Sequence, residues 1–484
     1  MHKKFVLNIV SRVQMIVCMI MTIPLLWAIA DDPHSKETIS FIVTILLGLF
    51  VSCIVFWNVR MDTEDYERLN AKDGLAIVGL SWVCLSAFGA LPLYLSHVVS
   101  NYTDAFFEIV SGFTTTGATI FIDVEALPRG ILFWRSLTHW LGGMGIIVLY
   151  LTLLPVVSKN DFQLFKAESP GITVERVEPR IKETAKMLWT VYVLLSVVET
   201  ILLMLGKMPF FDALCHTFGT MATGGFSTKN ASIGAYGPYI QWVITFFMFL
   251  AGVNFMLHYQ ALRGKIGQYF RNEEFKWYLF LAVVSIFIFT VVLHLNSIVS
   301  SPLRTAAFQT FSVMTTTGYV TADFDIWPQA LRFILIVLMF IGGCGGSTGG
   351  GMKVIRFFLS LKIALRSIMQ ALFPNAVLPV RFNKAPQADR IVSSVLSFFV
   401  IYIALFFLGT IVMTITERCD LVTAFSASIA CLSNIGPGLG KVGAVGNYAW
   451  ISNPGKWFLS FLMLAGRLEL YSILVLFIPS TWHK

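Results

Sequence analysis

The feature that most constrains this chain is the recurrence of apolar runs long enough to cross a membrane. Such runs extend from one end of the sequence to the other, as at residues 41–57 and 280–295, and about 20 mostly apolar residues suffice for one helical crossing. Only 13% of the 484 residues are charged, whereas about a quarter is usual in a soluble domain. So few charges cannot cover a water-facing surface. We therefore predict an all-α integral membrane protein that crosses the bilayer several times.

Positive charges gather in alternate loops between these runs, and their positions predict the orientation. Lysine and arginine concentrate in five segments, at 3–4, 60–72, 159–186, 263–276 and 353–390. Because cytoplasmic loops carry an excess of positive charge, the pattern places both termini in the cytoplasm. It also accounts for the formal net charge of +8, so no nucleic acid partner is expected. The seven cysteines are scattered and show neither a disulfide framework nor a zinc-binding spacing.

One unit with a fixed spacing occurs four times along the chain. In each copy, an aspartate or threonine that is followed by alanine stands thirteen positions before a glycine. The four pairs are Asp104 and Gly117, Asp212 and Gly225, Thr305 and Gly318, and Thr423 and Gly436. We call these four glycines the hairpin glycines. Small-residue clusters follow them at 140–145, 249–254, 340–346 and 463–469. Each unit is predicted to contain a long helix, a short segment of about a dozen residues, a polar return and a second long helix.

These patterns divide the chain into two additional N-terminal transmembrane helices and four units. The two helices occupy residues 1–68, and the units occupy 69–160, 180–270, 274–372 and 388–484, the third with an intramembrane glycine-rich loop. An apolar run of 10 to 14 residues is too short to span and suggests a re-entrant segment. Such backbone is tolerated at membrane depth only where protein or a water-filled cavity surrounds it. The four short segments should therefore converge on a central aqueous pore in a pseudo-fourfold arrangement.

The ends of the four short segments, which we call the hairpins, are chemically alike. They read TTTG (114–117), ATGG (222–225), TTTG (315–318) and SNIG (433–436). Glycine permits backbone geometries that other residues resist, so successive carbonyl oxygens can face one axis and replace the hydration shell of a cation. Each short helix would direct its negative C-terminal end at the same space. A plainer interpretation stays open, in which the glycines only cap helix C-termini.

The two aspartates of the repeat, Asp104 and Asp212, stand at the start of their short segments. The other two copies carry threonine at this position, so an ion-binding role shared by all four units is not expected of it. We predict instead that both aspartates are N-caps of the short helices.

Together with the stretches at 341–356, 434–440 and 466–469, the hairpins resemble the Trk/Ktr/HKT superfamily of potassium transporters over essentially the whole chain. The resemblance is to the bacterial TrkH/TrkG type, to which the two extra N-terminal helices and residues 179–189 also point. It implies a homodimer in the bacterial inner membrane, regulated by a cytoplasmic nucleotide-binding ring of the TrkA type. It also implies a filter for K+, and for Rb+ as well, formed by Thr115, Thr116, Gly117, Thr223, Gly224, Gly225, Thr316, Thr317, Gly318, Asn434, Ile435 and Gly436.

A second glycine-rich segment, residues 342–351, is called here the glycine-rich loop. It cannot continue a stable helix, because each interior glycine costs about 1 kcal/mol relative to alanine. It lacks the GK[ST] ending of a nucleotide-binding P-loop, while a helix break that allows tight packing remains an alternative. The resemblance implies that the segment is a gate below the filter, with Gly343, Gly345, Gly346, Ser347, Thr348 and Gly349 among its residues.

Arg467 stands within an apolar run of the fourth unit, and the other units carry no charge at the corresponding position. A charge inside the membrane is expensive and usually faces a cavity or a partner. The arginine could face the pore as an electrostatic barrier to K+. It could also pair with Glu469, and the two roles are compatible.

These inferences lead to one expected function and three rivals. We expect a non-enzymatic K+ uptake protein. The rivals are a sodium-selective or sodium- or proton-coupled cation transporter of the same superfamily, an intramembrane enzyme built around Ser347 or His139, and a non-conducting scaffold. The scaffold would leave the four hairpins unexplained. The basic connectors at 158–186 and 353–390 are the expected contact surface for the regulatory partner or for anionic lipid headgroups.

Overall fold

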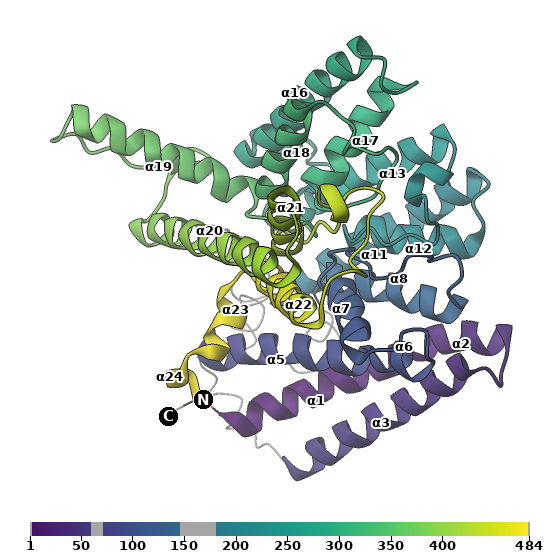
Figure 1. The fold of residues 1–484 in the computed structure, drawn as a ribbon. Helices are drawn as coiled ribbons and strands as arrows, with labels where there is room; N and C mark the ends of the chain where they lie inside the picture. Colours follow the sequence, from purple (N-terminus) through teal and green to yellow (C-terminus); the bar gives the residue numbers. More distant parts are fainter. Residues whose placement is uncertain (1, 60–70, 146–180, 483–484) are drawn as a thin grey trace.

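The computed structural model describes residues 2–59, 71–145 and 181–482 (Figure 1). The boundaries predicted near residues 68 and 160, and most of the basic connector at 158–186, lie outside the described residues. The unit boundaries therefore remain predictions.

The four units share one order of elements. Within the described residues, the first unit contains α5 (Ala71–Gly89), its continuation α6 (Leu91–Leu95), α7 (Tyr102–Phe113) and α8 (Arg129–Gly143). The second contains α11 (Ile181–Leu205), α12 (Phe210–Met221) and α13 (Pro238–Ala251), and the third α16 (Glu273–Leu295), α17 (Pro302–Met314) and α18 (Gln329–Ile341). The fourth contains α20 (Asp389–Glu417), α21 (Leu421–Leu432) and α22 (Asn453–Arg467). We call α7, α12, α17 and α21 the short helices.

The remaining elements connect or flank these units. The chain begins with α1 (Lys3–Ile20), α2 (Thr22–Asp31) and α3 (Lys36–Asn58). After their second helices, the second unit continues with α14 (Phe255–Leu262) and ends at α15 (Gly267–Arg271), and the third unit ends with α19 (Val354–Leu372). An antiparallel pair of two-residue strands, β1 (Arg381–Phe382) and β2 (Ala385–Pro386), lies between the third and fourth units. Short turns of helix occur at η2 (Ser232–Ala235), η3 (Gly440–Val442), α23 (Tyr471–Leu474), η4 (Val475–Phe477) and α24 (Pro479–Trp482).

Six helical segments of the described chain are long and apolar enough to cross a membrane. They cover Lys3–Asp31, Lys36–Asn58, Lys72–Leu95, Glu183–Leu205, Glu273–Leu295 and Asp389–Glu417. The pair α13 and α14, bent by 100°, would make a seventh if it counts as one broken span. The prediction of a multi-pass, all-α membrane protein is confirmed.

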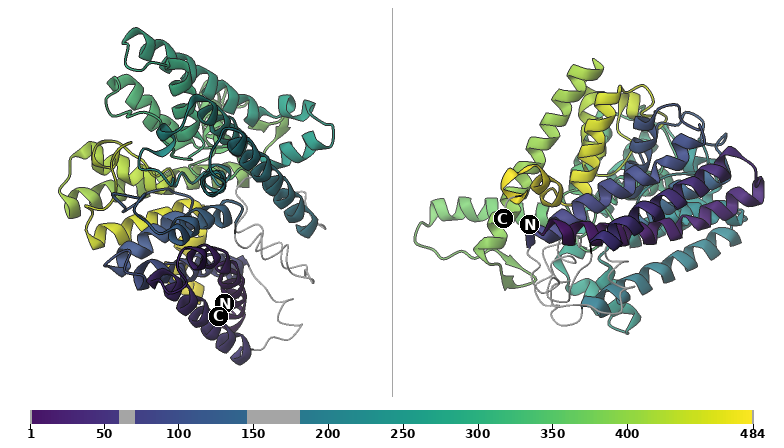
Figure 2. Two further views of the ribbon diagram at one scale, coloured as in Figure 1. Left: turned by 90° about the vertical axis from the view of Figure 1, so that its right-hand side faces the viewer. Right: turned by 90° about the horizontal axis from the view of Figure 1, so that it is seen from below.

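The additional N-terminal helices pack against the first unit. The span made by α1 and α2 contacts α5 through α1 and α8 through α2, and α3 lies against α1 and α6 (Figure 1). The described ends of the chain lie beside each other in all three views (Figures 1 and 2). Figures 1 and 2 also show α19 projecting from the body of the protein next to α20.

The units are joined in a closed ring by their second helices. Each of these packs against the short helix of the next unit, α8 against α12, α13 against α17, α18 against α21 and α22 against α7. Within each unit, the long first helix packs against its own short helix. Each short helix is therefore packed between the first helix of its own unit and the second helix of the preceding unit.

The second helices are shorter than the sequence suggested. They contain 13 to 15 residues and end at or beside the small-residue clusters. Glycines in these clusters allow the hairpins to approach closely, because a Cβ on Gly142 would collide with the Phe113 carbonyl and one on Gly466 with the Leu432 carbonyl. The clusters therefore both interrupt the helices and seat the ends of the short helices.

Candidate functional site

The four short helices end in the same backbone motif. In the first unit the Thr115 amide donates to the Gly112 carbonyl at 3.0 Å, and the Thr116 amide donates to the Ser111 carbonyl at 2.9 Å. The equivalent two bonds occur at the ends of α12, α17 and α21. This pair of bonds defines the Schellman motif, whose cap residue adopts a left-handed conformation.

The left-handed cap residue is not glycine in any unit. It is Thr115 (φ 53°), Thr223 (φ 55°), Thr316 (φ 62°) and Asn434 (φ 58°). Such a conformation in a non-glycine residue costs roughly 1–3 kcal/mol and persists only where the surrounding structure enforces it, typically at functional sites. Its repetition at four equivalent positions indicates a shared functional constraint.

The hairpin glycines follow two residues after these caps and also have positive φ, between 79° and 92°. They are therefore not the helix caps, and the plainer interpretation of them as C-caps is wrong. Their role follows from their neighbours. A Cβ on Gly117, Gly225 or Gly318 would lie less than 2.5 Å from a carbonyl oxygen of the next unit, and one on Gly436 would lie 2.6 Å from the Thr116 oxygen.

These close approaches connect the hairpins in one cycle. Gly117 abuts the carbonyl of Gly224, Gly225 that of Thr317, Gly318 that of Ile435, and Gly436 that of Thr116. The partner is in every case the residue immediately before the next hairpin glycine. Eight of the twelve residues predicted to form a filter thus lie in a closed ring, which consists of four carbonyls and the four hairpin glycines. The other four are the left-handed cap residues, each of which directly precedes one of these carbonyls in the sequence.

Side chains support this ring from behind. The hydroxyls of Thr114 and Thr116 lie 2.8 Å apart, as do those of Thr315 and Thr317 in the third unit. Asn434 donates through Nδ2 to Thr116 Oγ1 at 3.0 Å and to the Met463 carbonyl at 2.9 Å. The asparagine therefore joins the fourth hairpin to the first.

A cavity lies on each side of the ring. One cavity, of about 140 Å³ and called the outer cavity after the orientation predicted from the positive loops, is lined by the hairpin glycines and by the residues that follow them, among them Thr119, Ser227 and Tyr448. The inner cavity, of about 60 Å³, is lined by the glycine-rich loop and by the ends of α8 and α22. Each is large enough for several water molecules, because one water needs roughly 10–15 Å³ of such volume.

The glycine-rich loop lies directly against the inner ends of the hairpins. The Gly350 amide donates to Thr316 Oγ1 at 2.6 Å, and the Gly351 amide donates to the Ser433 carbonyl at 3.0 Å. Thr348 Oγ1 donates to the Met221 carbonyl at 2.9 Å. The loop therefore contacts the second, third and fourth hairpin regions at once.

The other predicted gate residues lie in the same loop. The Gly346 carbonyl accepts from the Phe255 amide at 3.0 Å, and the Gly349 carbonyl accepts from Lys353 Nζ. Gly343 packs against the backbone of Gly252. Ser347 Oγ donates to the Cys344 carbonyl at 2.5 Å.

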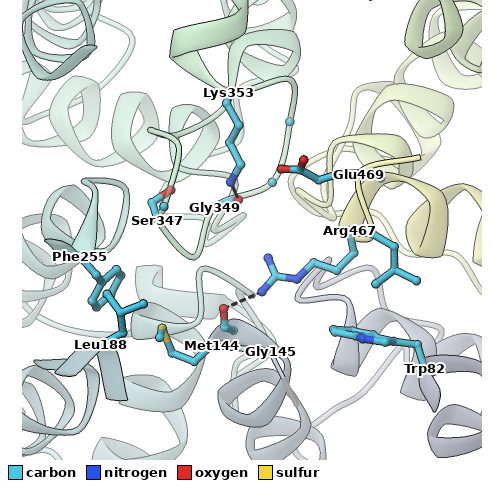
Figure 3. Close-up of a pocket in the computed structure, with 16 residues that line it drawn as sticks. Trp82, Met144, Gly145, Leu188, Phe255, Ser347, Gly349, Lys353, Arg467 and Glu469 are labelled. Atoms are coloured by element: carbon cyan, nitrogen blue, oxygen red, sulfur yellow. Dashed lines mark hydrogen bonds between the residues drawn. The ribbon is translucent and has the colours of Figure 1, made fainter. Parts of the chain in front are cut away.

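Arg467 points from the end of α22 into the inner cavity (Figure 3). Its guanidinium donates to the carbonyls of Thr348 at 2.6 Å, Gly142 at 2.6 Å and Gly143 at 2.7 Å. The cation thus bridges the glycine-rich loop and the end of α8. Glu469 pairs with Arg356 of α19 at 2.5 Å, so this carboxylate also contributes to holding α19 against the site.

Two residues that contact the glycine-rich loop are not apparent from the sequence. Glu274 is only 4% exposed, and its Oε1 accepts from the Gly345 amide at 2.6 Å and from the Ile355 amide at 3.1 Å. Lys353 is also buried, and its Nζ donates to the Gly349 carbonyl of the loop. In the sequence, Glu274 is one of two adjacent glutamates at the start of an apolar run, and nothing local distinguishes it from Glu273.

The prediction that Asp104 and Asp212 are N-caps is wrong. α7 is capped by Asn101, whose side chain accepts from the Thr103 amide, and α12 follows Pro209. Both aspartates lie inside the first helical turn. Asp104 pairs with Lys456 at 2.6 Å, and Asp212 accepts from Thr228 Oγ1 at 2.6 Å. Asp104 therefore attaches α7 to α22, and Asp212 attaches α12 to the chain that follows the second hairpin.

The residues named for the enzyme rival have structural partners. His139 Nδ1 lies 2.9 Å from the Gly112 carbonyl, and its Nε2 lies 3.3 Å from the Phe226 amide. The Ser347 hydroxyl is directed at a backbone carbonyl. In the described part of the chain, no group of three His, Cys, Asp or Glu side chains could hold a metal ion.

Comparisons with known proteins agree on one family. The profile of the TrkH family, described as a cation transport protein, matches residues 41–484. The Trk system potassium uptake protein TrkH of Salmonella typhimurium is 40% identical over 452 residues, which cover 92% of each chain. The protein of the same name from Escherichia coli is 38% identical over 491 residues, which cover 100% of each chain. The crystal structure of the potassium transporter TrkH from Vibrio parahaemolyticus superposes with a TM-score of 0.89 at 34% identity, over 100% of each chain.

Proposed function

This chain belongs to the TrkH family of cation transport proteins, and on that premise we propose that it takes up K+ across the bacterial inner membrane. The relatives compared above are named as potassium uptake proteins or as a potassium transporter. The observation that carries the proposal is the closed ring of hairpins, in which each hairpin glycine abuts a carbonyl of the next unit.

The ring suits K+ because it offers neutral oxygen atoms. Carbonyl groups arranged around an axis can replace the water molecules that an entering ion loses. The negative ends of four short helices add a favourable potential for a cation. We assign the ion contacts to the carbonyls of the four hairpins, from Thr115 and its equivalents to the hairpin glycines. Rb+ would be accepted for the same reason.

We assign the gate to the glycine-rich loop and Arg467. The loop lies between the ring and the inner cavity, and a positive guanidinium beside it would repel a passing cation. Because the loop is held by hydrogen bonds to three hairpin regions and to Arg467, its displacement would require these bonds to break together. Opening would then be an all-or-none event rather than a gradual widening.

The homodimer and the TrkA-type regulatory ring are also proposals, drawn from the family resemblance. The projecting helix α19 supports them, because it exposes Leu365, Ile368 and Leu372 and its N-terminal end lies directly after the glycine-rich loop (Figure 1). A partner bound to α19 could therefore act on the loop. We propose both termini in the cytoplasm, in keeping with the positive loops.

The test is cation flux into proteoliposomes that contain this chain alone, compared for K+, Rb+, Na+ and Li+ and repeated with Gly117→Ser. A preference for K+ and Rb+ that is lost in the variant would support the filter. Equal flux of all four ions would favour the sodium-selective or ion-coupled rival. Absence of flux, even when the glycine-rich loop is shortened, would reject the pore.

The enzyme rival predicts the opposite pattern. An active site at Ser347 would be lost in Ser347→Ala and unaffected by Gly117→Ser. The filter predicts that Gly117→Ser changes ion preference, because both the positive φ and the neighbouring Gly224 carbonyl oppose a side chain there.

A further inference from the structure

A polar side chain behind each hairpin connects the short helix to the chain that returns from the ring. The position lies nine residues before the hairpin glycine and is occupied by Glu108, His216 and Gln309 in the first three units. The fourth unit has Ala427 there, and its neighbour Ser426 takes the same role. None of these residues belongs to the ring itself.

We call each of these four connections a brace. The brace of the first unit is an ion pair buried away from water. Glu108 and Arg135 have side chains 0% and 1% exposed, and Arg135 approaches Glu108 Oε1 to 2.6 Å. Glu108 Oε1 accepts from Thr119 Oγ1 at 2.9 Å, and its Oε2 accepts from the Ile120 amide at 2.9 Å. Both partners lie just after Gly117. The carboxylate therefore fixes the outer end of the first hairpin through charge-assisted hydrogen bonds, which are about twice as strong as neutral ones.

The braces of the other units are neutral or weaker. His216 Nε2 lies 3.0 Å from Ser227 Oγ, and Gln309 Nε2 lies 3.4 Å from Thr321 Oγ1. In the fourth unit Ser426 Oγ exchanges two bonds of 2.9 Å with the backbone of Leu439. The four connections are equivalent in place, but only the first unit uses a carboxylate and a guanidinium.

Arg135 also links the first hairpin to the second. Its guanidinium lies 4.1 Å from the centroid of the Phe226 ring, and Phe226 directly follows the second hairpin glycine. One helical turn further along α8, His139 bridges the Gly112 carbonyl and the Phe226 amide. The first brace therefore contacts its own hairpin through Thr119 and Ile120 and the second hairpin through Phe226.

We propose that Glu108 and Arg135 are positioning residues that set ion specificity, by holding the outer end of the first hairpin at a fixed distance from the second. The proposal rests on the proposed function, because specificity is defined only if the ring selects the ion. Binding atoms keep a selective geometry only where a surrounding shell holds them to within about 0.5 Å. Among the four braces, that of the first unit is the one formed by a carboxylate and a guanidinium.

The test measures the K+/Na+ permeability ratio from reversal potentials in proteoliposomes containing the full chain. Two variants weaken the brace. Glu108→Gln removes the charge that faces Arg135 and could impair folding, because it leaves a buried cation without its ion pair. Thr119→Val keeps the ion pair and the bond from the Ile120 amide, and it removes the hydroxyl that joins Glu108, Arg135 and the Phe121 amide. We expect the ratio to fall at least fivefold in Glu108→Gln and at least threefold in Thr119→Val, while the yield of Thr119→Val stays unchanged.

The matched control is Glu37→Gln. Glu37 is also buried, and its Oε1 accepts a backbone amide at 2.7 Å, that of Ile131 in α8 rather than one in a hairpin. The K+/Na+ permeability ratio of Glu37→Gln should stay within twofold of the ratio measured for the unmodified protein. An equal fall in the control would overturn the proposal, as would an unchanged ratio in Thr119→Val. If the unmodified chain itself fails to distinguish K+ from Na+, the proposed function fails instead, and this inference fails with it.

Discussion

The carboxylate of Glu274 should hold the glycine-rich loop in its blocking position. Its Oε1 accepts one amide from the loop, Gly345, and one from the first turn of α19, Ile355. The two amides flank residues 346–354, so a single carboxylate holds the part of the loop from Gly345 onward against the start of α19. Both bonds are made in the packed position of the loop, so we expect their loss to shift the balance toward other loop positions.

The size of the effect follows from the two amides. Glu274→Ala would leave both buried donors without a partner, at a cost of roughly 1–3 kcal/mol each, or roughly 2–6 kcal/mol together. Since 1.4 kcal/mol corresponds to about tenfold in an equilibrium, we expect the basal flux of the chain alone to rise at least tenfold. Glu274→Gln keeps an acceptor oxygen at the same place and should raise the flux much less.

The assay is initial Rb+ uptake into proteoliposomes, normalised to the amount of inserted protein. Glu273→Gln is the control, because Glu273 is the neighbouring residue and pairs with Lys362 at 2.9 Å outside the loop. It should leave the flux unchanged. We call the two bonds of Glu274 the loop latch. The latch would be refuted if Glu274→Ala gave normal protein yield but no more flux than the unmodified chain.

Three further predictions concern the ring and its attachment to the loop. Gly436→Ala should reduce the K+/Na+ permeability ratio less than Gly318→Ala. To clear the new Cβ at 3.0 Å, the neighbouring carbonyl oxygen would need to move by about 0.4 Å at Gly436 but by more than 0.5 Å at Gly318. Equal permeability ratios in the two variants would contradict this order. Arg467→Gln should raise basal Rb+ uptake severalfold, since it removes the positive charge and weakens the bonds to three carbonyls, and Arg467→Lys should raise it less. Thr316→Val should cost about 1 kcal/mol of loop attachment by removing the acceptor of the Gly350 amide, measurable as a severalfold rise in basal flux; an unchanged flux would show that this bond does not hold the loop.

Much of the architecture was predictable because its signals are local. The length of the apolar runs determines that helices cross a membrane, and one repeated spacing of thirteen residues reveals four related units. The Thr/Gly hairpins and the glycine-rich loop could also be found in this way, since a glycine-rich segment disfavours helix wherever it occurs. The family resemblance rested on these same segments.

Other features depended on residues far apart in the sequence. The reason for each hairpin glycine is a carbonyl in another unit, and the braces and the loop latch join positions such as Glu108 with Arg135 and Glu274 with Gly345. The N-cap prediction failed for a local reason, because Asn101 already caps α7 and α12 follows Pro209. The partner that Asp104 does have, Lys456, lies 352 residues away. Sequence periodicity specifies which segments form helices, whereas a close contact between units is set by how four whole units pack around one axis. Only the tertiary structure could decide those contacts.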